Sequence, residues 1–155
     1  MSVLFTVSAP LAGRAVALSD VNDDVFATGM VGWGAAIDPG EAEHFMVTSP
    51  CGGVVSTVFP HAFALDLDTG DQILVHLGME TIALKGEGFT PVVVPGQRVE
   101  RGQDMIGWDT RPAREREIDL LSPVVVVQVP SERIEVSAAL GSSVSIGQTL
   151  FTVRL

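Results

Sequence analysis

The sequence is poor in cysteine, in basic residues and in long apolar runs. Cys51 is the only cysteine among 155 residues, which excludes an intrachain disulfide framework and fits a reducing compartment. Nine Lys and Arg residues against 19 Asp and Glu give a formal net charge of −10, which repels phosphate backbones and argues against nucleic-acid binding. The same charge favours a partner with a basic docking face, or simply solubility. No apolar run approaches the roughly 18 residues that a membrane span needs, so we expect no direct membrane insertion.

The beginning of the chain does not look like a secretion signal. No basic residue precedes its apolar stretch, and Pro10, Gly13 and Arg14 interrupt that stretch. We interpret it as a strand, a turn and a second strand, and expect a cytoplasmic protein. The length predicts one domain over residues 1–155, and a hydrophobic fraction of 46% is ample for a core.

Short valine-rich segments bounded by Gly, Pro, Asn, Asp or Ser succeed one another along the chain, a pattern typical of β-strands joined by turns. The expected strands are Leu4–Val7, Gly13–Leu18, Ala35–Asp38, Phe45–Thr48, Gly53–Val58, His61–Leu67, Gln72–Leu77, Pro91–Val94, Met105–Trp108, Pro123–Val129 and Thr149–Arg154. They predict an all-β fold, an antiparallel β sandwich or barrel with at most one or two short helices. The helical candidates are Pro112–Leu121 and a short turn near Asp20–Asp24.

Two weak internal repeats predict a duplication. Residues 96–103 and 141–148 both read G-x-x-V-x-x-G-Q, and each precedes an apolar strand. Residues 9–13 likewise resemble residues 49–53. Two interleaved copies of a β unit would explain both similarities. Two copies are too few for a solenoid. The alternative is that the shared pattern is merely a tight turn between strands.

His61 and His76 flank a turn at Asp68–Asp71, which predicts a β-hairpin. Side chains alternate between the two faces of a strand, so the wholly apolar set that includes Ile73 and Val75 should face the core and His76 should point away from it. With the turn centred between residues 69 and 70, Phe63 lies opposite His76 and His61 is its diagonal neighbour, roughly 7–8 Å away at the backbone. A bulge at the glycine of this turn would shift the register by one residue.

Such a pair allows more than one chemistry. A neutral imidazole is a nucleophile near pH 7, and a second imidazole can donate a hydrogen bond to a phosphoryl group. The pair could equally hold a metal, or be two unrelated surface histidines. Gly78 leaves space beside His76 for another protein, and Phe63, Leu74 and Leu77 are candidates for an apolar docking rim. We interpret His44 as a solvated loop residue and Cys51 as a small buried residue.

The stretch from His61 through Asp109 resembles the enzyme IIA (EIIA) domain of the glucose family in the bacterial phosphoenolpyruvate-dependent sugar phosphotransferase system. The segments that carry the resemblance are His61–Phe63, Asp68–Gly70, Leu74–Gly78, Thr81–Phe89 and Gly96–Val99, with Ala9–Gly13, Asp20–Phe26 and Val31–Gly34 upstream. Among them the run Leu84–Phe89, at its distance after His76, is the most specific. The resemblance covers nearly the whole chain.

The resemblance implies a phosphotransferase component with a phosphohistidine intermediate and an antiparallel β sandwich fold. His76 would accept a phosphoryl group from the phosphocarrier protein HPr and pass it to a cysteine of the IIB domain of a sugar permease. His61 would be the auxiliary imidazole, and Asp23 and Glu80 would join the docking surface. No cofactor is required, although some family members bind zinc through the two histidines together with a partner's carboxylate.

Three departures from the family pattern stand out. Phe59 occupies a position where the family often has a threonine that supports the auxiliary histidine. Glu80 replaces a shorter acidic residue after the active histidine. The chain also begins at its first strand, without the amphipathic extension of well-studied free-standing members.

Three other interpretations compete with this one. A zinc hydrolase of related architecture would need an acid at Leu65 and a histidine at Gly78, and a catalytic zinc site needs three protein ligands. A lipoyl-type carrier would use Lys85, which lacks the expected flanking residues. A purely regulatory protein-binding module of the same fold is the third. Which sugar the system transports is not encoded in these motifs.

Overall fold

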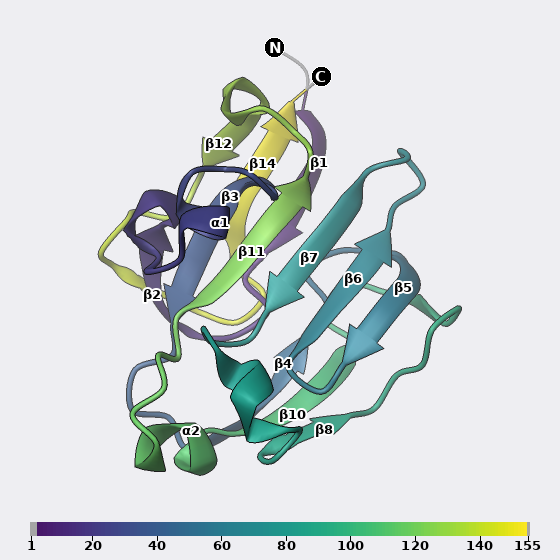
Figure 1. Ribbon diagram of the computed structural model, residues 1–155. Helices are drawn as coiled ribbons and strands as arrows, with labels where there is room; N and C mark the ends of the chain where they lie inside the picture. Colours follow the sequence, from purple (N-terminus) through teal and green to yellow (C-terminus); the bar gives the residue numbers. More distant parts are fainter. Residues whose placement is uncertain (1–2, 155) are drawn as a thin grey trace.

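The computed structural model describes residues 3–154, which form three antiparallel sheets (Figure 1). The strands are β1 (Val3–Ser8), β2 (Gly13–Ala17), β3 (Gly32–Asp38), β4 (His44–Thr48), β5 (Gly53–Phe59), β6 (Ala62–Asp66), β7 (Gln72–His76), β8 (Phe89–Pro91), β9 (Arg98–Val99), β10 (Asp104–Asp109), β11 (Ser122–Val127), β12 (Ile134–Val136), β13 (Ser143–Val144) and β14 (Thr149–Arg154). The helices are α1 (Asp24–Ala27) and α2 (Arg111–Glu115), with 3₁₀ turns η1 (Leu18–Asp20), η2 (Thr81–Leu84) and η3 (Ser131–Arg133). The predicted all-β fold with short helices is therefore confirmed.

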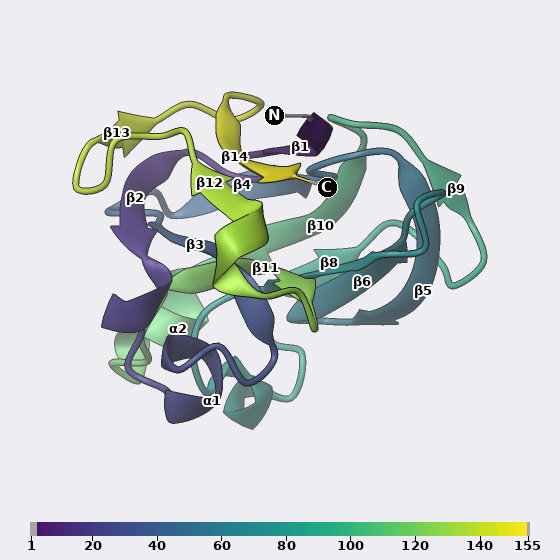
Figure 2. The ribbon, with the colours of Figure 1, turned by 90° about the horizontal axis from the view of Figure 1, so that it is seen from above.

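One large sheet curls around two small ones. Its strand order is β13-β2-β3-β11-β7-β6-β5-β9, and the small sheets have the orders β1-β14-β12 and β4-β10-β8. Seen from above, β13 and β9 lie on opposite sides of the molecule with the small sheets between them (Figure 2). The space between the sheets holds the main core, whose largest fully buried side chains include Trp108, Phe63 and Phe151.

The predicted duplication is confirmed by strand pairing. We call residues 3–18 and 134–154 the first copy, and residues 44–59 and 89–109 the second copy. In the first copy β14 lies between β1 and β12, and β13 pairs with β2. In the second copy β10 lies between β4 and β8, and β9 pairs with β5. Figure 1 shows the small sheet of the first copy at the top and that of the second copy at the bottom.

The repeated G-x-x-V-x-x-G-Q motif makes the same backbone hydrogen bonds in both copies. The Gly102 N–H donates to the Ser49 carbonyl oxygen at 2.9 Å, and the Gly147 N–H donates to the Ala9 carbonyl oxygen at 2.9 Å. Both glycines have a φ of +84°, in the left-handed region where a side chain is disfavoured. The motif is a tight turn, as the alternative interpretation held, and it is also the mark of the duplication.

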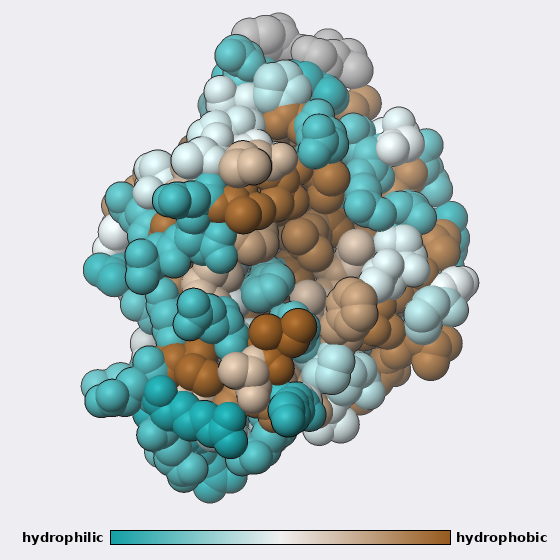
Figure 3. Space-filling view, in the orientation of Figure 1, coloured by the Kyte–Doolittle hydropathy of each residue, from teal (hydrophilic) through white to brown (hydrophobic). Residues whose placement is uncertain are grey.

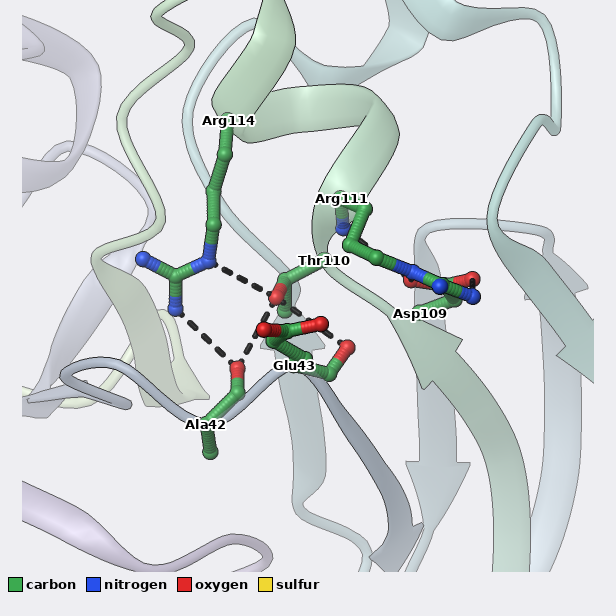
Figure 4. A network of polar contacts seen from close by, with 6 residues as sticks. All are labelled: Ala42, Glu43, Asp109, Thr110, Arg111 and Arg114. Atoms are coloured by element: carbon green, nitrogen blue, oxygen red, sulfur yellow. Dashed lines mark hydrogen bonds and ion pairs between the residues drawn. The ribbon is translucent and has the colours of Figure 1, made fainter.

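The helix expected over residues 112–121 is much shorter. α2 ends at Glu115, and Glu117 has a φ of +56°, which an α-helix cannot accommodate. The segment is held instead by a polar network around Thr110, the residue before α2. The Thr110 hydroxyl donates to the Ala42 carbonyl oxygen at 2.8 Å, and Arg114 Nε donates to the Thr110 hydroxyl at 2.9 Å (Figure 4). Arg114 and Arg116 of this segment thus make tertiary contacts rather than extend a long helix.

Two further expectations about secondary structure need correction. The strand expected at residues 91–94 lies earlier, at β8, because it is residues 89–91 that pair with β10. The short strands β9, β12 and β13 were not expected, because two or three residues are too few to show an alternating pattern. None of the helices in residues 3–154 has the length and apolar character needed to cross a membrane.

Candidate functional site

The β6–β7 hairpin has a register one residue away from the predicted one. Ala62, not Phe63, lies opposite His76, and Phe63 lies opposite Val75. The cause is the loop, in which Leu67 N–H donates to the Asp71 carbonyl oxygen at 2.9 Å and so encloses three residues instead of two. Gly70, the last of the three, has a φ of +89°, as in hairpin loops that end in a bulged glycine.

His61 lies in a turn rather than in a strand. It comes directly after Pro60 in a two-residue connection between Phe59 and Ala62, which pair with each other across β5 and β6. Its carbonyl oxygen accepts a hydrogen bond from the Leu77 N–H at 2.8 Å, which ties the turn to the end of β7. Strand alternation therefore does not fix the direction of its side chain.

The structure nevertheless brings the two imidazoles together. The ring centroids of His61 and His76 are 5.0 Å apart, with an angle of 76° between the ring planes. Both side chains are half-buried, His61 in the turn before β6 and His76 at the end of β7, and His76 points away from the core, as the alternation in β7 predicts. The predicted proximity holds, although the diagonal pairing that predicted it is wrong.

A backbone carbonyl fixes the tautomer of His76. Nδ1 lies 2.7 Å from the carbonyl oxygen of Gly78, and because a carbonyl oxygen only accepts, Nδ1 carries the proton. Nε2 of the neutral ring then keeps its lone pair. Gly78 itself is held by a hydrogen bond from its N–H to the Ser122 hydroxyl at 3.1 Å.

Gly78 serves the backbone rather than an approaching partner. It is buried, and a Cβ there would come within 2.6 Å of Thr81 Cγ2 and 2.9 Å of the Asp119 carbonyl oxygen. Its φ of +79° is in the region that glycine adopts without strain. The expected space for another protein is thus filled by this chain, and the glycine aims its carbonyl oxygen at His76.

Burial keeps both imidazoles neutral. Loss of solvation lowers the pKa of His76 below its ordinary value of 6.5, against the opposing effects of the Gly78 carbonyl and the Asp23 carboxylate, which raise it. Loss of solvation also lowers the pKa of His61, and the neighbouring His76 lowers it further. Both rings are therefore unprotonated at pH 7 and available as nucleophile or hydrogen-bonding partner.

Three phenylalanine rings surround the pair. The Phe26 ring, from α1, has its centroid 5.4 Å from that of His76. The Phe59 and Phe89 rings lie 6.1 Å and 6.5 Å from His61. The sequence pattern singles out only Phe59 of the three, although Phe26 and Phe89 lie within the segments that carry the family resemblance.

The other predicted docking residues divide into buried and accessible ones. Phe63 and Leu77 are 1% and 0% exposed, so the expectation that they form a surface rim is wrong. Leu74 is partly buried and packs against a second core cluster. Glu80 is exposed, and Asp23 is half-buried at the N-cap of α1, where its carboxylate accepts a hydrogen bond from the Val25 N–H.

The run Leu84–Phe89 packs beside the turn that carries His61. Gly86 lies against Pro60, next to His61, and Gly88 approaches the Asp109 carbonyl so closely that a Cβ would come within 2.5 Å of that oxygen. These turns place the buried Phe89 ring next to the ring of His61. The motif thus packs against His61 and Pro60 without contributing a reactive group.

The two imidazoles provide only two metal ligands. Across residues 3–154 no group of three or more His, Cys, Asp or Glu side chains is close enough to hold a metal ion, and a zinc site needs at least three protein ligands.

The third histidine and the cysteine lie away from the imidazole pair. His44 is exposed at the start of β4, and Cys51 is buried, with burial raising the pKa of its thiol to about 11.

Comparison with known proteins points to one family. The model of the phosphoenolpyruvate-dependent sugar phosphotransferase system EIIA 1 family matches residues 5–131. The chain is also similar to a solved structure, the glucose permease IIA from Mycoplasma capricolum, with 28% sequence identity and a TM-score of 0.83. That match covers 96% of this chain and 94% of the other.

Proposed function

Because the chain belongs to the glucose-family EIIA domains of the phosphoenolpyruvate-dependent sugar phosphotransferase system, we propose that it carries a phosphoryl group on His76. The donor is the phosphohistidine of HPr and the acceptor is a cysteine in the IIB domain of a sugar permease, in the cytoplasm. The observation that carries this proposal is the tautomer of His76, which leaves the lone pair of Nε2 beside a second neutral imidazole.

The first transfer uses Nε2 as nucleophile. Nε2 attacks the phosphorus, the P–N bond to the HPr histidine breaks, and the bonding electrons leave with the HPr imidazole. The ring of His76 gains positive charge as the new P–N bond forms. Nδ1–H stays bonded to the Gly78 carbonyl oxygen, which stabilises that charge without taking the proton.

His61 assists both transfers. Its ring lies at a steep angle to that of His76 and can donate a hydrogen bond to an oxygen of the phosphoryl group held on Nε2. In the second transfer a cysteine thiolate of the IIB domain attacks the phosphorus and the bond to Nε2 breaks, which returns His76 to its neutral form. No cofactor takes part in either step. His61 and His76 would be this chain's ligands to a zinc ion that a partner's carboxylate completes, and a zinc-bound imidazole would not be free to accept a phosphoryl group.

The surface around the pair suits protein partners. Val25 of α1, Phe59 at the end of β5 and Ile82 of η2 are large apolar side chains that are 46%, 55% and 71% exposed. On the face of the molecule that carries α1 and β7, hydrophobic patches alternate with hydrophilic side chains (Figure 3). An excess of acidic over basic residues adds attraction toward a partner with a basic docking face.

Intact-mass measurement tests the proposal. The purified chain is incubated with phosphoenolpyruvate, enzyme I and HPr, and we expect one acid-labile phosphoryl group per chain. His76→Ala should abolish the label, and His44→Ala, which removes the exposed histidine, should keep it. Unchanged labelling of His76→Ala would overturn the assignment, and a chain that takes no label at all would favour a purely regulatory role.

A further inference from the structure

The imidazole of His61 is held by rings and not by hydrogen bonds. Within residues 3–154 its ring makes no hydrogen bond, whereas the ring of His76 is anchored to a carbonyl at 2.7 Å. The neighbours of the His61 ring are His76 on one side and the aromatic rings of Phe59 and Phe89 on the others. Its orientation therefore depends on packing.

Phe59 and Phe89 hold the ring in different ways. Phe89 is 8% exposed, stacks on the fully buried Trp108 at 5.4 Å, and meets the His61 ring at a steep angle of 65°. Phe59 lies across the two-residue turn, and its plane is inclined by only 28° to that of His61, an offset-stacked arrangement. Phe89 and Trp108 thus form a buried packing surface on one side of His61. Phe59 stacks on the imidazole from an exposed position.

Phe59 is an exposed aromatic residue that lies beside the site. Its side chain is 55% exposed at the end of β5, outside both core clusters, and it is the one aromatic residue among the large exposed apolar side chains of residues 3–154. Among the aromatic rings of residues 3–154, the neighbour of the Phe59 ring is that of His61.

We propose that Phe59 is a positioning residue for phosphoryl transfer, whose ring holds the imidazole of His61 facing Nε2 of His76. The inference rests on the proposed function for its catalytic consequence, but the geometric part concerns the free protein. An imidazole positioned by stacking keeps both ring nitrogens free of internal partners. One nitrogen can then donate to the phosphoryl group in whichever direction the incoming partner places its oxygens.

The first test is structural and needs no partner. In NMR spectra of the unphosphorylated chain we expect contacts between ring protons of His61 and Phe59, and between ring protons of His61 and His76. Phe59→Leu keeps apolar bulk but removes the flat ring, and should weaken the His61–His76 contacts. Phe59→Tyr should preserve them. Contacts that survive in Phe59→Leu would overturn the positioning role even if His76 proves to be the phosphoryl acceptor.

The second test is kinetic and uses phosphorylated chain with the IIB domain. Phe59→Ala and Phe59→Leu should lower kcat for onward transfer about tenfold, short of the roughly 100-fold that a 1 Å misplacement can cost. Phe59→Tyr should restore the rate, and Leu140→Ala, a similarly exposed apolar residue in the first copy, should leave it unchanged. A rise in KM alone, with kcat unchanged, would show that Phe59 only contacts the partner.

Discussion

The two copies of the β unit share a framework and differ in the segment that leaves its second strand. In the second copy β5 leads into the two-residue turn that carries His61. In the first copy β2 leads instead into η1 and α1, which carry Asp23 and Phe26. Both segments converge on His76 in β7, one of the two strands at the centre of the large sheet. The candidate chemistry thus lies where the duplicated parts stop being alike.

The copies also differ at one position of the repeated G-x-x-V-x-x-G-Q motif. The repeated motif has Arg101 in the second copy where it has Ile146 in the first. Arg101 donates hydrogen bonds to the carbonyl oxygens of Thr6 and Pro50 and to the hydroxyl of Ser8, which ties β1 to the second copy. At the matching position Ile146 lines an apolar hollow of about 270 Å³.

His61→Ala should have the largest effect, because it removes the group that only the turn after β5 of the second copy supplies. We expect the chain still to accept a phosphoryl group and to pass it on about 10²–10³-fold more slowly, as when one transition-state donor is lost. Rapid-quench measurement of transfer to the IIB domain checks this. A variant that transfers at the parent rate would remove the functional difference between the copies.

Arg101→Ile should come next, because it makes the second copy resemble the first. Losing the hydrogen bonds of the guanidinium to Thr6, Ser8 and Pro50 should lower the free energy of unfolding by about 1–3 kcal/mol. Urea unfolding measures the change, with Ile146→Ala as the matched substitution in the first copy. Phosphoryl transfer should not change, and an equal loss in both copies would contradict the comparison.

A smaller effect is expected from pH. The pKa values of His61 and His76 are lowered on folding, so the unfolded chain binds these protons more strongly. The associated stability is fully present above pH 6.5 and is lost as pH falls through the lowered folded values. The difference in unfolding free energy between pH 7.5 and pH 5 should therefore shrink when both histidines are replaced by alanine, relative to His44→Ala. An undiminished difference would contradict the burial of the pair.

Asp23→Asn should have the smallest effect and tests whether the segment that leaves β2 of the first copy reaches the site. Asn can still accept the Val25 N–H at the start of α1, but it lacks the charge that raises the pKa of His76. We expect the pKa of His76 to fall further, as measured by NMR titration of its ring protons. An unchanged pKa of His76 would show that the Asp23 carboxylate has no electrostatic effect on that imidazole.

Much of the fold was predictable from local patterns, because apolar and polar residues alternate along many of the strands and turn residues mark their ends. The placement of His76 was predictable for the same reason: Ile73, Val75 and Leu77 are all 0% exposed, on the face opposite its ring. The tight turns of the duplication were readable from their glycines. The specificity of the run Leu84–Phe89 made the family recognisable from the sequence alone.

The details of the pair were not predictable from alternation. A single left-handed residue, Gly70, lengthened the hairpin loop and moved the register by one position. That shift placed Phe63 in the core rather than on the face of His76, and left the position of His61 to a turn. The contact between Phe26 and His76 depends on where α1 packs in three dimensions, which no local pattern specifies.

The central claim is that Nε2 of His76 carries the phosphoryl group, since the Gly78 carbonyl occupies Nδ1. NMR of the phosphorylated chain, labelled with ¹⁵N in its histidines, tests this through the coupling between phosphorus and ring nitrogen. We predict coupling to Nε2 of His76 in a ring whose Nδ1 remains protonated. Coupling to Nδ1 of His76, or to a nitrogen of His61, would contradict the account.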